Sequence, residues 1–247
     1  TAPSLLAVTE LWLQIVFKIK EKPMAKIEDT KSLPLKEKKK PKIENGKLMA
    51  EGVEIKTYSS IEHQNISQIT SLVLHRTDST TANGTLDAYA KGKKAGAHFL
   101  IDKSGNIYQT ASMLKACWHV GILLPRCQIE KNCNPKELKT IFALIHEKGI
   151  GFGQRARNLS RHETNKSYPL RYPSNTDSIG IEVVGKFLPS EKSFEKPTPQ
   201  QLKSLKWLVE ILAKEYNLDI KSDVYAHGAI ARKEVSESAQ LLQYLFS

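Results

Sequence analysis

Two histidines stand in similar surroundings and have the chemistry to bind a metal ion. His75 ends the segment SLVLH and His227 ends SDVYAH, each where a predicted buried strand opens into a loop. Functional groups are common at such points, because the sheet fixes the backbone while the loop leaves the side chain accessible. Two neutral imidazoles and one carboxylate make a zinc site that keeps its fourth position for water. Glu234 and Glu237 both follow His227 closely enough to supply that carboxylate.

The segments that must position these histidines have the pattern of a packed α/β domain. Short apolar runs and a Gly-containing turn at Lys103 to Gly105 predict strands at residues 69–74, 98–101, 106–110 and 178–184. Helices are expected at residues 86–94 and 135–148. Apolar residues at three-and-four spacing and a capping sequence predict a further helix at residues 198–216. Strands that alternate with helices predict a single mixed β-sheet flanked by helices.

Residues 1–50 differ in composition from the rest of the chain. A strand-like segment, Leu11 to Ile19, is followed by a mixture of Lys, Glu and Pro, and these fifty residues hold eleven Lys against six acidic residues. We interpret them as a short N-terminal strand and a Lys-rich linker. Residues 51–247 form the second predicted domain. Its insert, at about residues 122–176, is expected to hold one helix and a Gly-, Arg- and Asn-rich rim loop.

Composition narrows the class of partner. The formal net charge of +11 and the pI near 9.4 attract the chain to polyanions. The densest lysine run, Lys36 to Lys42, has no interleaved aromatic residues, which argues against nucleic acid. No apolar run has the length of a membrane span, so no membrane insertion is expected. Cys127 and Cys133 are near enough to bridge in an oxidising compartment, and two free thiols are the alternative.

Four blocks of sequence carry a resemblance to a known family. In chain order they are LVLHRTDS (72–79), AGAHFLIDKSGNIYQ (95–109) continuing to ACWHVG (116–121), NTDSIGIEVVG (175–185) and AHGAIARK (226–233). Together they resemble the zinc-dependent N-acetylmuramoyl-L-alanine amidases of the phage-lysozyme and recycling-amidase type. That family shares its fold with the peptidoglycan recognition proteins. The similarity extends from about Ser71 to Leu242.

The resemblance implies a role for four residues. His75 and His227 match the first and second zinc ligands. Glu182, in SIGIE, matches the acidic residue that takes a proton from the activated water, and Lys233 matches the lysine that stabilises charge on the tetrahedral intermediate. Amide hydrolysis needs these functions: an activated water, a cation near the developing oxyanion and a proton for the leaving amine.

The third ligand departs from the family pattern. Related enzymes place Asp or Cys where this chain has Val235, which cannot bind zinc. Glu237 lies ten residues after His227, a spacing that some relatives use, and we prefer it to Glu234. Ser236 is a poorer candidate because a neutral hydroxyl is a weak ligand.

Three further residues fall within the matching blocks. The resemblance implies that His98 and His119 line the substrate groove beside the metal, and Trp118 is a candidate to bind the sugar. The alternatives without a direct function are a structural role for His98 in its strand and a position in the hydrophobic core for Trp118. Cys117 is expected to be a small buried apolar residue. His146 and His162 are expected at the surface of the insert.

These observations together predict an enzyme of the cell wall. Residues 51–247 are expected to be a zinc amidase domain that cleaves peptidoglycan between N-acetylmuramic acid and L-alanine. The alternative is a muropeptide recognition module with the same fold and no activity. The Lys-rich linker fits a tether from a larger upstream protein, such as a secretion-system effector with antibacterial activity, and a phage-type lysin is the other setting. Either implies delivery to the bacterial periplasm or cell wall, and an effector implies an immunity protein.

Overall fold

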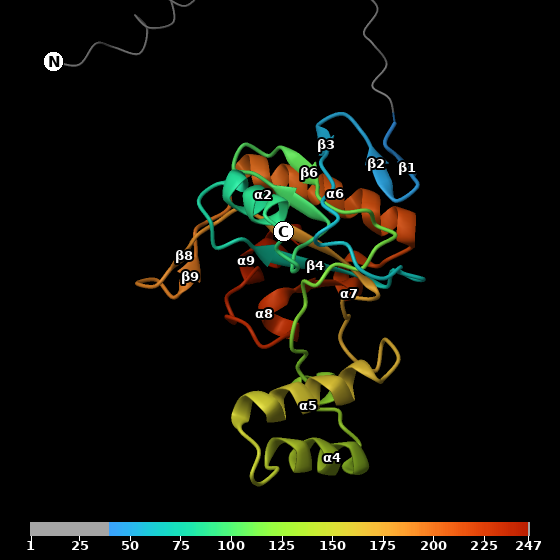
Figure 1. Ribbon diagram of the computed structural model, residues 1–247, viewed down its shortest axis with the longest axis vertical. Coiled ribbons are helices and arrows are strands. Elements are labelled where there is room, and N and C mark those ends of the chain that lie inside the picture. The colour runs from blue at the N-terminus through green and yellow to red at the C-terminus, as the bar shows by residue number, and fades with distance from the viewer. Residues whose placement is uncertain (1–39, 247) are drawn as a thin grey trace, which may run out of the picture. The chain divides into compact units, whose positions relative to one another are not determined.

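The structure is a computed structural model that describes residues 40–246 (Figure 1). The predicted strand at Leu11 to Ile19 and most of the Lys-rich linker lie outside the described residues. A six-stranded sheet forms the centre of the described part, with β5 antiparallel to β6 and every other pair parallel. The predicted mixed sheet is therefore confirmed. In spatial order its strands are β10 (Val224–Ala226), β4 (Ser71–Arg76), β7 (Ser178–Val183), β5 (Phe99–Ile101), β6 (Ile107–Gln109) and β3 (Val53–Ile55).

One face of the sheet is apolar and is covered by helices α6 (Pro199–Tyr216) and α9 (Ala239–Leu245). Helix α6 begins with the predicted capping box, in which Thr198 and Gln201 satisfy each other's backbone N–H groups. Its apolar stripe then packs under the central strands, and burial of this surface is the main source of stability for the fold. The buried residues of this layer include Leu72, Leu74, Ile179, Ile181, Val183, Leu205, Leu208, Val209 and Leu212.

The opposite face carries the polar side chains. His75 on β4 is paired with Glu182 on β7, two residues beyond the pair of Val73 with Gly180, so these side chains share one face. Helix α2 (Ala82–Ala90) covers part of this face through the buried Leu86. The helix was expected at residues 86–94. It ends earlier because the chain turns at Gly92, which has φ of +90°.

The insert is mostly helical. It contains α3 (Arg126–Ile129), α4 (Pro135–Ile145) and α5 (Phe152–Thr164), and Figure 1 shows α4 and α5 lying side by side. The prediction of α4 is confirmed, but that of a rim loop after it was wrong, because the polar stretch forms α5. Its low hydrophobicity hid the helix, although Arg and Gln are good helix formers. Cys127 of α3 forms a disulfide with Cys133, which lies in the segment between α3 and α4.

Smaller elements complete the described chain. Strands β1 (Lys42–Glu44) and β2 (Lys47–Met49) form a hairpin whose Leu48 is fully buried in the core under the sheet. The packed domain therefore includes residues that we assigned to the linker. The other elements are the hairpin of β8 (Phe187–Leu188) and β9 (Ser193–Phe194) and the short helices α7 (Ile220–Asp223) and α8 (His227–Ile230). Among residues 40–246, no helix is both long and apolar enough to cross a membrane.

Candidate metal centre

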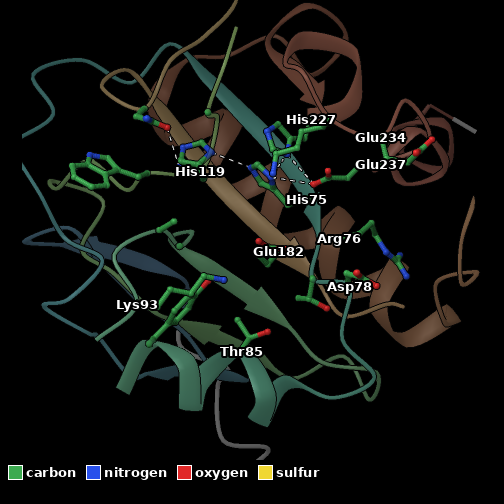
Figure 2. A pocket seen from close by; sticks show the side chains of 18 of the residues that line it. His75, Arg76, Asp78, Thr85, Lys93, His119, Glu182, His227, Glu234 and Glu237 are labelled. Atoms are coloured by element: carbon green, nitrogen blue, oxygen red, sulfur yellow. Dashed lines mark hydrogen bonds and ion pairs between the residues drawn. The ribbon is translucent and has the colours of Figure 1, made fainter. Parts of the chain in front are cut away.

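His75 and His227 come together because β4 and β10 are neighbouring parallel strands. Leu74 is paired with Ala226. The residues that follow them, His75 and His227, therefore lie side by side at the carboxyl ends of these strands. The Nδ1 atoms of the two histidines lie 2.9 Å apart, and each residue is only 2% exposed. Figure 2 shows the two rings pointing toward each other at the wall of a cavity.

Glu237 completes a group of three ligand atoms. Its Oε1 lies 2.8 Å from Nδ1 of His227 and 3.6 Å from Nδ1 of His75. The loop after α8 folds back over Gly228, where a Cβ atom would lie 2.2 Å from the carbonyl oxygen of Glu234, so only glycine fits. Glu234 itself is exposed and points away from the histidines (Figure 2). Of the two glutamates left open by the sequence, the structure brings Glu237 to the site.

The surroundings keep these ligands in the protonation states that a metal requires. Burial, together with repulsion from His227, lowers the pKa of His75 from 6.5 to about 4, so its ring is neutral at neutral pH. Burial alone would raise the pKa of Glu237, but hydrogen bonds with His227 and His75 outweigh this and hold it below its usual value. Glu237 is therefore ionised. A neutral His75 and an anionic carboxylate are suited to a divalent cation.

The spacing of the donor atoms fits zinc. Zn–N and Zn–O bonds of about 2.0–2.2 Å in a tetrahedron place ligand atoms roughly 3.4 Å apart. The three distances among Nδ1 of His75, Nδ1 of His227 and Oε1 of Glu237 are 2.9, 2.8 and 3.6 Å. These residues form one of two groups of potential metal ligands in the described part of the chain. The other, in the insert, is made by Glu137, His162 and Glu163, and Lys166 already forms ion pairs with both of its glutamates.

Glu182 lies beside the histidines on β7 and lines the same cavity. Its Oε2 is out of contact with solvent and has no hydrogen-bond partner among the described residues. Burial, with a contribution from the charge of Glu237, raises the pKa of Glu182 from 4.5 to about 8. Lys93, Lys233 and Arg76 act in the opposite direction. A carboxyl group with a raised pKa, close to a site for an activated water, can accept a proton and later return it.

The cavity in front of these residues has a volume of about 660 Å³ and a largely polar lining. Lys233, in the loop after α8, is one of its lining residues. Lys93, which follows α2, lies on the wall opposite the histidines (Figure 2). The structure therefore brings His75, His227, Glu237, Glu182 and Lys233 to one cavity, as the sequence predicted. Arg76, Asp78 and Thr85 also line it, and no pattern in the sequence had selected them.

The three residues expected to line the groove have different positions. Trp118 does line the cavity and is 48% exposed, so the alternative of a core tryptophan was wrong. Its ring stacks on His63 at 3.8 Å between centroids, a partner that the sequence did not reveal. His98 is fully buried and does not line the cavity: one ring nitrogen accepts from the Gly180 N–H, and the other contacts the Lys115 carbonyl. The structural role therefore replaces the groove role for His98.

His119 lies at the cavity wall, but its ring is turned toward His75. The position of His162 also differs from expectation. It is half-buried, and its Nε2 lies 2.8 Å from a carboxylate oxygen of Glu137, whereas His146 is exposed as expected. Cys117 is a buried free thiol, as expected.

The family model described as N-acetylmuramoyl-L-alanine amidase matches residues 65–239. The chain belongs to this family. The match covers more than half of the chain and includes every residue of the metal-ligand group. The predicted enzyme class, an N-acetylmuramoyl-L-alanine amidase acting on peptidoglycan, is thereby confirmed.

Several solved structures are similar to this chain. One is the N-acetylmuramoyl-L-alanine amidase LysC from Clostridium intestinale, with 20% identity over 73% of this chain and 87% of that one and a TM-score of 0.41. A mutant endolysin from Bacillus subtilis has 16% identity over 78% and 97% of the two chains and a TM-score of 0.44. AmiD from E. coli, solved with a muropeptide substrate, has 19% identity over 67% and 50% and a TM-score of 0.42. No curated protein matches the sequence. The family assignment therefore rests on the family model.

Proposed function

We propose that this amidase hydrolyses the bond between N-acetylmuramic acid and the first L-alanine of the stem peptide with a zinc ion held by His75, His227 and Glu237. The observation that carries the proposal is the close approach of three suitable donor atoms beside a polar cavity. Zinc bound there supplies a water that is activated at neutral pH. The remaining steps belong to side chains of the protein.

Glu182 is the proposed proton carrier. Its raised pKa suits a group that takes a proton during attack on the amide carbonyl and then delivers it to the leaving amide nitrogen. Lys233 is proposed to stabilise the negative charge that develops on the carbonyl oxygen. It lines the same cavity and lies on the loop that carries Glu237. Trp118 offers an exposed ring to the sugar of the substrate.

Digestion of purified sacculi tests the proposal. We expect the wild-type protein to release free stem peptides, identified by mass spectrometry, and His227→Ala to release none. Removal of metal with a chelator should abolish release, and added Zn²⁺ should restore it. Binding to sacculi without any release would instead favour the muropeptide recognition module.

We further propose that the protein acts outside the cytoplasm, in the bacterial periplasm or cell wall, as a delivered antibacterial effector or a lysin. The Cys127–Cys133 disulfide supports this setting, because such bonds persist in oxidising compartments. Expression in a bacterium with and without a periplasmic export signal tests it. Lysis should require export, and lysis by the unexported chain would contradict the proposal. A cognate immunity protein, if the chain is an effector, should prevent lysis when co-expressed in the periplasm.

A further inference from the structure

The loop that carries His119 is held rigidly against the metal-ligand group. The backbone N–H groups of His119 and Val120 both donate to Oδ1 of Asn175, at 2.9 and 2.8 Å. The His119 ring also lies directly on strand β7. A Cβ atom added to Gly180 would lie 2.9 Å from Cγ and Nδ1 of this ring. The close contact between the ring and the strand therefore requires glycine at position 180. The ring is therefore fixed from two sides.

Both nitrogens of the His119 ring have partners, and these partners define where its proton lies. Nε2 is 3.3 Å from Oγ of Ser178, and that hydroxyl donates its hydrogen to the carbonyl of Ser174 at 2.5 Å. The Ser178 oxygen can therefore only accept from His119, which places the His119 proton on Nε2. Nδ1 of His119 is left as an acceptor, and it lies 3.0 Å from Nε2 of His75.

The acceptor on His119 determines which nitrogen of His75 carries the proton. An acceptor facing its Nε2 requires a proton there, and a neutral imidazole then has a free lone pair on Nδ1. Nδ1 is the atom that faces His227 and Glu237. The neighbouring residue acts on the second ligand in the same way: the carbonyl of Val120 lies 2.7 Å from Nε2 of His227. Two adjacent residues of one loop thus orient both ligand histidines.

We propose that His119 is a positioning residue that holds His75 in the Nε2-protonated tautomer, with Nδ1 directed at the metal. The proposal rests on the proposed function, in which His75 binds zinc. It replaces a groove-lining role for His119 with one exerted through His75. Loss of a group that orients a metal ligand typically lowers metal affinity about 10- to 100-fold.

The test compares two substitutions of His119 that differ in one hydrogen-bond acceptor. His119→Asn keeps an oxygen near the place of Nδ1 and can still accept from His75, whereas His119→Leu has a similar volume and no acceptor. Zinc affinity is measured by competition with a chromophoric chelator. We expect affinity about 10- to 100-fold weaker in His119→Leu and largely restored in His119→Asn. His146→Asn, on the exposed surface of the insert, is the control and should bind zinc like the wild type.

Nitrogen NMR of the metal-free wild-type protein reads the tautomer directly. We expect the proton of His75 on Nε2, and a mixture of tautomers in His119→Leu. Unchanged zinc affinity in His119→Leu, an equal loss in His119→Asn, or a wild-type His75 protonated on Nδ1 would overturn the proposal. If His119→Leu does not fold, His119→Asn and the wild-type spectrum still decide. A wild-type protein that takes up no zinc would count against the proposed function, while the tautomer would still report on His119.

Discussion

Nδ1 of His75 and Nδ1 of His227 lie 2.9 Å apart, although the two residues are separated by 152 positions in the chain. Parallel pairing of β4 with β10 explains this short distance, because it brings the carboxyl ends of two segments that are distant in sequence next to each other. Glu237 is brought to the same point by a loop rather than by a strand.

Substitution of the two glutamates after α8 should have opposite outcomes. We expect Glu237→Ala to lose bound zinc and the release of stem peptides, because only two ligands remain. Glu234→Ala should keep both, since its side chain is exposed and points away from the histidines. Metal analysis and sacculus digestion on the two purified variants check this. Equal effects of the two substitutions would contradict the assignment of the third ligand.

Glu182→Gln should separate metal binding from chemistry. The amide keeps the shape of the side chain but cannot take a proton, so we expect kcat to fall about 10²- to 10⁴-fold. Zinc content should be unchanged, because Glu182 is not one of the three donors. Steady-state kinetics on a soluble muropeptide, with zinc measured on the same samples, provide the check. A variant with wild-type kcat would remove Glu182 from the mechanism.

The same substitution should stabilise the metal-free protein at alkaline pH. The pKa of Glu182 is raised to about 8 in the folded state from 4.5. The unfolded chain therefore loses this proton more readily, and the penalty for folding grows from about pH 4.5 to pH 8. Melting curves should give Glu182→Gln a Tm advantage over the wild type that is larger at pH 8 than at pH 5. An advantage independent of pH would contradict the raised pKa.

Acid should destabilise the metal-free protein below pH 6.5 through two buried histidines. Burial lowers the pKa of both His75 and His98 to about 4 from 6.5. The unfolded chain therefore gains protons below pH 6.5 that the folded chain accepts only near pH 4, so stability is lost across that window. Urea unfolding at pH 7, 6, 5 and 4 should show a steadily falling free energy of unfolding in Glu182→Gln, a variant that lacks the opposing titration of Glu182. Bound zinc should extend this loss below pH 4, because a metal-bound His75 accepts no proton in the folded state.

The disulfide should stabilise the helical insert. Cys127 and Cys133 close a loop of sequence separation 6, for which the loss of chain entropy corresponds to about 2 kcal/mol. We expect Cys127→Ser/Cys133→Ser to increase hydrogen exchange in α3 and the start of α4 with little change in the central sheet. Cys117→Ser is the matched control, because Cys117 is a free thiol. Equal exchange in the double variant and the wild type would contradict the prediction.

Strand ends and apolar runs leave strong local patterns, and these predicted the central strands and the two histidines. The family resemblance selected Glu182 and Lys233. His75, His227 and Glu182 all lie on or next to strands whose register follows from these patterns. Glu237 was harder to assign, because its position depends on how a loop packs over Gly228. The roles of His98 and His119 depend on which way each ring turns, and no sequence pattern encodes that. Helix α5 was missed because its residues are mostly polar.

The parallel pairing of β4 with β10 also limits when the enzyme can become active. A ribosome must extend the chain through residue 237 before the second and third donors exist, and β10 must then pair across a long loop of already translated chain. Nascent chains and fragments truncated before β10 therefore contain His75 and Glu182 but lack His227 and Glu237. With the proposed metal site, we therefore expect hydrolysis of the cell wall only from chains whose translation has passed Glu237.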